Sequence, residues 1–261
     1  MLRSLYTAAT GMEAQQLKMD VISNNLANAS TTGFKKARAE FEDLLAETVR
    51  VPGAPLPGGG GDPAPLQVGL GVRTGSTTRS FAQGDVVATQ NSLDVAIEGR
   101  GFFRVIRPSG EAAYTRAGNF RLDGEGRLTT PHGERVEPGI EVPPETLDLT
   151  IKPDGTVLAR LPGTPELQEL GVIELTTFPN PDGLLAAGDN LFDATEAAGE
   201  PLQHRPGEDG AGQLAQGYLE SANVKAVEEM IGMISTQRAY ELCSKVIQTA
   251  DEMLQRLTTM R

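Results

Sequence analysis

The side chains best suited to catalysis or metal binding are few and scattered. His132 and His204 are the only histidines, and neither has a cysteine or a second histidine at the spacing of a zinc site. The one cysteine, Cys243, stands beside Leu242 in a helical pattern, which indicates a small packed hydrophobic side chain. A general base needs an orienting partner and a positioned nucleophile, and no such set can be assembled. The sequence therefore predicts no enzyme, no metal and no cofactor.

Two glycine-rich stretches also fail the tests for nucleotide binding. Gly58–Gly61 is not followed by the Lys and Ser or Thr of a phosphate-binding loop, and Gly99–Gly101 lacks a third glycine and a following helix. The acidic pair Glu228–Glu229 falls within a helical pattern, where solvated side chains are the ordinary interpretation. Nothing in the sequence selects a pair of carboxylates for catalysis.

The overall charge is strongly negative, with 35 acidic and 23 basic residues giving a net charge of -12. Such a chain repels phosphate backbones and anionic lipids, so neither nucleic acid nor membrane insertion is expected, although solubility alone explains the charge equally well. No apolar run approaches the roughly 20 residues that span a bilayer. The first 20 residues lack the apolar core of a secretory signal peptide. We expect a soluble chain, or one exported by another route.

The two ends of the chain have the sequence patterns of long helices. From Leu2 to Leu26, apolar residues step by three and four, which predicts a helix with one adhesive stripe. From Ala222 to Met260 there is no proline and a single glycine, which predicts one long helix. Each helix packing on its own domain is the simple alternative, but the shared pattern favours helix pairing. The predicted interface positions are Leu5, Met12, Met19, Leu26, Val227, Ile231, Ile234, Val246, Met253 and Leu257.

The segments between the helices have other patterns. Short apolar runs with alternation, separated by turn pairs such as Asp123-Gly124 and Asp154-Gly155, predict antiparallel strands between about residues 70 and 215. Residues 49–67 are rich in proline and glycine, which indicates a linker or an extended arm. A cluster of turn-forming residues follows the first helix and is interpreted as a helix-to-arm turn or as a simple cap: Asn24, Asn25, Asn28 and Gly33.

These patterns predict an α+β fold in which terminal helices pair as a coiled-coil layer and a mainly antiparallel β domain is inserted between them. The predicted boundaries place residues 1–70 with 217–261 in a helical core that includes an arm at 46–66. Residues 71–216 form the β-rich domain.

Four segments resemble the flagellar rod and hook family, in order and over nearly the whole chain. They are DVISNNLANASTTGFKKARAEFEDLL from Asp20, NSLDVAIEGRGFFRV from Asn91, YTRAGNFRLDGEGRL from Tyr114, and the stretch from Gln216 to Leu257. Within this family the distal-rod type fits best, because it has a similar length and an additional segment at the position of Ala46–Leu66. The resemblance implies a structural subunit that polymerises helically into a hollow, rigid drive shaft transmitting torque from the motor to the hook.

The resemblance also implies the partners and the location. The partners would be further copies of the chain, proximal rod and hook subunits, surrounding ring and bushing proteins, and the flagellar type III export apparatus. The location would be the flagellar basal body in the periplasm, reached without a cleaved signal peptide. A proximal-rod or hook paralogue, a secreted cell-wall enzyme and an exported adhesin with a coiled-coil stalk are the alternatives.

Overall fold

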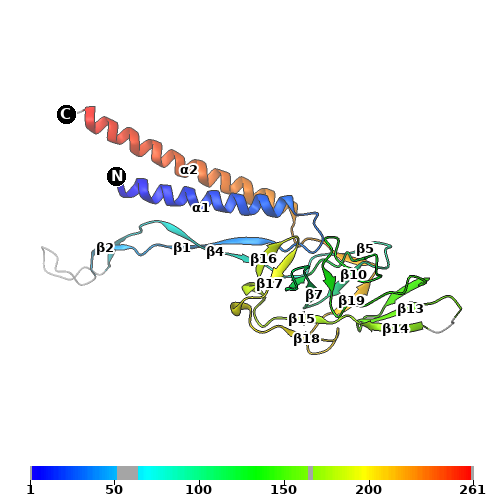
Figure 1. Cartoon of the computed structure of the whole chain (residues 1–261). Helices are drawn as coiled ribbons and strands as arrows, with labels where there is room; N and C mark the ends of the chain where they lie inside the picture. Colours follow the sequence, from blue (N-terminus) through cyan, green and yellow to red (C-terminus); the bar gives the residue numbers. More distant parts are fainter. Residues whose placement is uncertain (1, 52–63, 164–166, 260–261) are drawn as a thin grey trace. The chain divides into compact units, whose positions relative to one another are not determined.

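The computed structural model describes residues 2–51, 64–163 and 167–259, which form two compact units. One unit combines both ends of the chain with residues 37–78, and the other combines residues 28–36 with residues 79–224. A mainly antiparallel β region stands between a helix at each end of the sequence (Figure 1). The predicted α+β fold class is confirmed.

Helix α1 spans Leu2–Ala27 and helix α2 spans Ala226–Thr259, and the two pack along each other. Both are long because they lack proline, and the 34 residues of α2 give it a length of about 51 Å at 1.5 Å per residue. Glu228 and Glu229 lie in the first turn of α2, where negative charge suits the helix dipole.

The same unit contains an arm made of two short strand pairs. β1 (Ala37–Asp43) pairs with β4 (Val72–Arg79), and β2 (Glu47–Arg50) pairs in antiparallel register with β3 (Leu66–Val68). The central part of the predicted Pro- and Gly-rich segment, residues 52–63, lies outside the described residues.

The second unit is rich in short antiparallel strands. Its main sheet has the order β16-β17-β8-β7-β11-β10-β9, and β15 joins β7 to β18. The strands of this sheet are β7 (Phe102–Ile106), β8 (Ala112–Thr115), β9 (Arg121–Leu122), β10 (Leu128–Thr129), β11 (Arg135–Val136), β15 (Leu175–Thr177), β16 (Leu185–Gly188), β17 (Leu191–Asp193) and β18 (Leu202–His204). A separate sheet follows the order β12 (Asp148–Ile151), β13 (Thr156–Arg160) and β14 (Leu167–Val172).

Two strand pairs and two short 3₁₀ turns complete this unit. The pairs join β6 (Val95–Glu98) to β19 (Gln213–Gln216) and β5 (Val86–Ala88) to β20 (Tyr218–Glu220). The 3₁₀ turns are η1 (Pro181–Gly183) and η2 (Glu196–Ala198). Asp123-Gly124 lies between the paired strands β9 and β10, and Asp154-Gly155 lies between β12 and β13, as their turn chemistry predicts.

Two apolar clusters hold the β-rich unit together. The larger draws on most strands, with Phe103 against the ring of Phe120 at a centroid distance of 4.9 Å. The smaller is mainly aromatic, and its rings meet edge to face, an arrangement that aromatic rings favour. Its members are Phe102, Tyr114, Phe178, Leu184, Phe192 and Ala198, with Phe81 packed against them.

Candidate self-assembly surface

The contact between α1 and α2 depends on small residues. A methyl group added at Gly11 would lie 3.3 Å from Sγ of Cys243, and one added at Gly232 would lie 3.5 Å from Cδ1 of Ile22. Each glycine therefore faces a side chain of the other helix; a methyl group would crowd the sulfur at Gly11, whereas at Gly232 it would make an ordinary van der Waals contact. Cys243 is a packed side chain in this contact.

Asn25 joins three segments of the helical unit. Its Nδ2 donates to the backbone oxygen of Ala37 at 2.8 Å and to Oε2 of Glu229 at 3.1 Å, while its Oδ1 accepts the N–H of Ala37 at 2.9 Å. Asn25 is 1% exposed and Glu229 is 4% exposed. Because buried polar groups need partners with defined geometry, these bonds fix the register of α2 along α1 and the start of the arm.

The remaining residues of the predicted helix-to-arm turn have different surroundings. Asn28 accepts hydrogen bonds from Thr31, at its backbone oxygen at 3.0 Å and at its Oδ1 at 3.2 Å. Gly33 has φ +69°, and a methyl group there would lie 2.7 Å from the backbone nitrogen of Ala117, so only glycine fits. Asn24 is exposed.

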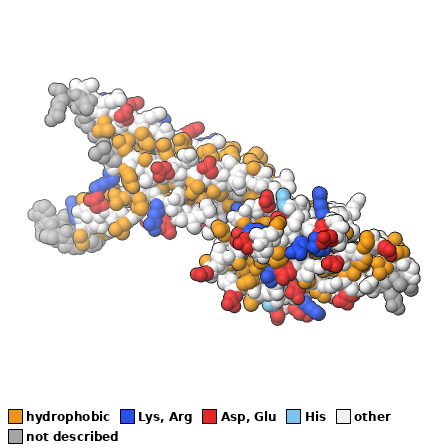
Figure 2. Space-filling view, in the orientation of Figure 1, with side chains coloured by type: hydrophobic (Ala, Val, Ile, Leu, Met, Phe, Trp, Pro, Cys, Tyr) orange, Lys and Arg blue, Asp and Glu red, His pale blue; other side chains and the backbone are white. Residues whose placement is uncertain are grey.

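A second apolar face of α2 remains open to solvent. Ile231 is 62% exposed, and the other predicted interface residues of α2 with described side chains are also exposed: Val227, Ile234, Val246 and Met253. Ile231 lies two residues after the buried Glu229, a rotation of about 200° around the helix. Val227, Ile231 and Ile234 therefore form an apolar face roughly opposite the contact with α1, whereas Val246 and Met253 lie beside that contact. Hydrophobic side chains are visible along the helices in Figure 2.

The predicted positions of α1 are half-buried: Leu5, Met12, Met19 and Leu26. The side chain of Leu257 lies outside the described part of the structure. The role of these residues at an interface between copies stays a prediction.

Sequence reasoning recognised Cys243 as a packed side chain but missed the polar residues on the buried side of α2. The interpretation of Glu229 as solvated is wrong, because Glu229 is 4% exposed. Glu229, Thr236 and Ala250 are buried and Cys243 is half-buried, and these four residues recur every seven positions. The heptad spacing was the available signal, but the pattern was hidden because its members are polar or small rather than large and apolar.

In the part of the arm that the structure describes, each sheet has two strands, and several apolar side chains are exposed. Leu45, Val49 and Leu66 are exposed. Arg73 donates to Oε2 of Glu42 from Nη2 at 2.6 Å and from Nε at 2.9 Å. Surface ion pairs contribute little, and a two-stranded ribbon depends on packing for its stability; β1 already packs against α1. Such an arm is stabilised when another surface covers it.

A buried charge cluster in the β-rich unit was also not predicted. Lys35 donates to Oε1 of Glu220 at 2.5 Å, and Arg116 reaches Oε2 of the same carboxylate at 3.3 Å. The N–H of Gly84 also donates to Oε1 at 2.8 Å. Burial lowers the pKa of Lys35, an effect that Glu220 opposes, and burial likewise lowers the pKa of Arg116. Two buried cations thus share one carboxylate.

The residues that suggested chemistry in the sequence are not assembled into a site. Nδ1 of His204 lies 3.4 Å from Oδ2 of Asp209, and His132 lines a separate pocket. Within the described residues, no group of three or more His, Cys, Asp or Glu side chains is arranged to hold a metal ion. Over that same part of the chain, neither helix combines the length and hydrophobicity needed to cross a bilayer.

Comparison with known proteins connects both ends and the β-rich unit to one family. Residues 5–35 match the flagella basal body rod protein model, residues 96–159 the flagellar hook protein FlgE/F/G D1 domain, and residues 215–260 the flagellar basal body rod FlgEFG protein C-terminal model. The flagellar basal-body rod protein FlgG of Caulobacter vibrioides is 48% identical over 261 residues, covering all of both chains. The chain belongs to the FlgG family.

Other FlgG proteins match over their full length as well. FlgG of Buchnera aphidicola subsp. Schizaphis graminum is 46% identical, and FlgG of Bacillus subtilis is 38% identical, each across all of both chains. The flagellar hook protein FlgE of Helicobacter mustelae is 44% identical over 52% of this chain and 30% of its own. The FlgG-family chain is thus a structural rod subunit of the flagellar basal body, and its role is in motility.

Proposed function

We propose that the protein is a subunit of the distal rod and assembles with copies of itself into a hollow, rigid helical shaft that transmits torque to the hook. The terminal helices form the inner layer of this shaft. Its role is mechanical rather than catalytic. A repeated head-to-tail contact that does not close into a ring generates such a filament.

The observation that carries this proposal is the second apolar face of α2. One face of the helix is already covered by α1, yet Val227, Ile231 and Ile234 remain more than half exposed on the other. Large exposed apolar patches on a folded chain mark interaction sites. A helical neighbour from the next copy fits this face, because both copies present long helices with apolar stripes.

The proposed interface consists of the ten predicted positions: Leu5, Met12, Met19, Leu26, Val227, Ile231, Ile234, Val246, Met253 and Leu257. Asn24, Asn25, Asn28 and Gly33 form the turn that leads from the inner helix into the arm. We retain residues 1–70 with 217–261 as the core domain and 71–216 as the β-rich domain.

The proposed partners follow from the place of the rod in the flagellum. Proximal rod and hook subunits adjoin the two ends of the polymer, and ring and bushing proteins surround it in the periplasm. The subunits leave the cytoplasm through the flagellar type III export apparatus, and no signal peptide is cleaved in this process. FlgG-family membership and the sequence match to a hook protein support association with rod and hook subunits.

The test is a charge placed on the exposed face of α2. Ile231→Glu should abolish pelletable polymer at concentrations where the unchanged protein assembles, because it prevents burial of an isoleucine worth about 1.5–3 kcal/mol at each contact. Sedimentation measures the assembled fraction, and circular dichroism shows whether the monomer retains its helices.

Gln237→Glu is the matched control, since Gln237 is exposed on α2 outside the apolar face. This variant should assemble like the unchanged protein. Normal assembly of Ile231→Glu, or equal loss in both variants, would contradict the proposed role of this face.

A further inference from the structure

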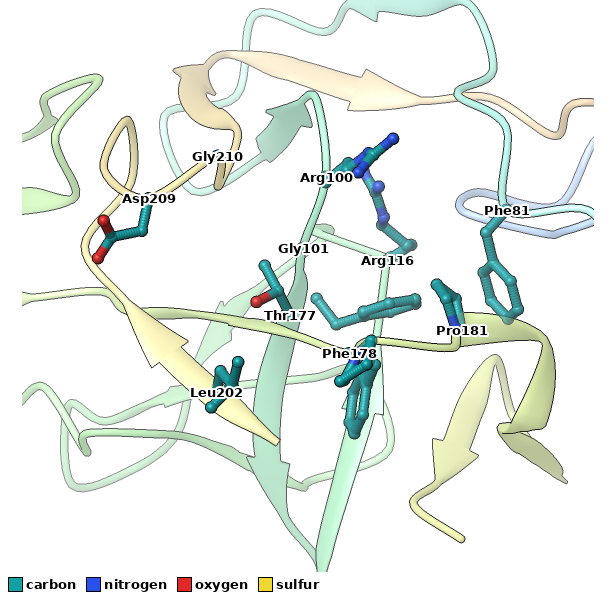
Figure 3. A pocket seen from close by; sticks show the side chains of 12 residues that line it. Phe81, Arg100, Gly101, Arg116, Thr177, Phe178, Pro181, Leu202, Asp209 and Gly210 are labelled. Carbon is teal, nitrogen blue, oxygen red and sulfur yellow. The ribbon is translucent and has the colours of Figure 1, made fainter. Parts of the chain in front are cut away.

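The aromatic cluster of the β-rich unit opens into a pocket of about 630 Å³. This volume is within the range of sites that hold small ligands or a few side chains. Figure 3 shows Arg100 and Arg116 along one edge of the pocket, with Phe178 and Leu202 on the opposite edge. The pocket thus combines an apolar floor with cationic groups at one side.

The charge around this pocket is not balanced within the unit. Arg116 shares the carboxylate of Glu220 with Lys35, so the buried cluster behind the pocket has an excess positive charge. Arg100 adds another cation at the exposed edge, and Asp209 is the acid that lines the pocket. Buried Nε of Arg116 has no hydrogen-bond partner among the described residues. An acidic group beside an apolar side chain would complement both features.

The same unit displays a segment with the complementary chemistry. Leu147 is 69% exposed and is flanked by the exposed acids Glu145 and Asp148. The segment is held in place, because Thr146 donates to the backbone oxygen of Pro143 from Oγ1 at 2.7 Å and from its N–H at 3.0 Å. A pre-ordered projection loses little conformational entropy on binding.

We propose that the pocket of one copy receives the Glu145–Asp148 segment of a second copy. Leu147 enters between the aromatic side chains, and an adjacent carboxylate pairs with Arg100. The contact joins two different patches of the same chain, as a head-to-tail assembly requires. This inference rests on the proposed helical assembly and assigns one of its contacts.

Disulfide trapping tests the contact in full-length protein with Cys243→Ser as background. A chain carrying Leu147→Cys and Leu202→Cys should give a ladder of dimers, trimers and higher species when polymer is oxidised, because each copy offers both partners. Both positions are exposed, so the unit should fold. The control pairs Leu147→Cys with Leu185→Cys, which is 62% exposed and does not line the pocket.

A charge exchange provides the second measurement. Arg100→Glu and Asp148→Arg should each raise the critical concentration for assembly by about three- to fivefold, and the double variant should restore it. Polymer that forms without the specific ladder, an equal ladder in the control, or a bond only within one chain would overturn the contact and leave the proposed function standing. Failure of the unchanged protein to polymerise would overturn both.

Discussion

Glu220→Gln should strongly destabilise the β-rich unit. In the protein, Oε1 of Glu220 accepts from both Lys35 and the N–H of Gly84, and Oε2 accepts from Arg116. Both oxygens face donors, so either orientation of a glutamine amide sets its NH₂ group against a donor. Removing one partner from a buried charge cluster costs about 3–5 kcal/mol. At about 2–4 °C per kcal/mol, the melting temperature should fall by roughly 10 °C.

The pH dependence of this loss identifies its cause. Burial holds the pKa of Lys35 below its ordinary value of about 10.4, and removal of Glu220 lowers it further. The unfolded chain then binds more protons than the folded chain between the lowered pKa and 10.4, so stability rises with pH in that window. The deficit of Glu220→Gln should therefore shrink as the pH is raised from 7 towards 10.

The assay is denaturant-induced unfolding, monitored by hydrogen exchange of backbone amides in the β-rich unit, which gives the free energy of unfolding of that unit. Adding Lys35→Met to Glu220→Gln should recover part of the loss and remove the rise with pH, because one buried cation is gone. The exposed residue Glu200 supplies the control, and Glu200→Gln should change stability by less than about 0.5 kcal/mol. The reasoning would be refuted if the effects of Glu220→Gln and Lys35→Met on the free energy of unfolding were additive, or if the loss of stability in Glu220→Gln did not change with pH.

Two further predictions concern the helix-to-arm turn. Gly33→Ala should lower the free energy of unfolding by more than about 1 kcal/mol, because it combines an unfavourable positive φ with a clash against the backbone of Ala117. Gly110→Ala is the control: Gly110 also has a positive φ but open space around it, so the loss measured in thermal melts should be smaller. Asn25→Ala should cost about 1–3 kcal/mol by removing the buried hydrogen bonds of Asn25 with Glu229 and with the backbone of Ala37, and equal losses from the exposed Ser23→Ala in helical melting would contradict this.

Local sequence patterns predicted the helices and hairpins well, because these elements depend mainly on residues that are close in the sequence. The proline-free apolar stripes gave helices that end within a few residues of their predicted bounds, since helix formation depends on neighbours three and four residues apart. The Asp-Gly pairs at 123 and 154 both fall in hairpin loops, but the positive φ is at Gly155 in the second loop and at Gly126, two residues after the Asp-Gly pair, in the first.

Long-range pairings were beyond the sequence. Lys35 and Glu220 are 185 residues apart, and nothing in their local patterns indicates that they meet. The pairing of Asn25 with Glu229 spans 204 residues. Periodicity identifies an apolar face but does not say what covers it, which is why the predicted positions of α2 proved to be exposed in the single chain.

The two faces of α2 differ in the size of their apolar side chains, and therefore in how much apolar area each can bury. The face against α1 contains Gly232, Thr236, Cys243 and Ala250, which allow close approach but bury little apolar area each. Val227, Ile231 and Ile234 are on the other face, where each contributes about 1.5–3 kcal/mol only when another surface covers it. In the proposed polymer, much of the stabilisation of the helical unit would thus come from neighbouring copies. Helix order and assembly should therefore be coupled, so that hydrogen exchange in α2 slows when the unchanged protein polymerises, whereas Ile231→Glu, which does not assemble, shows no such slowing under the same conditions.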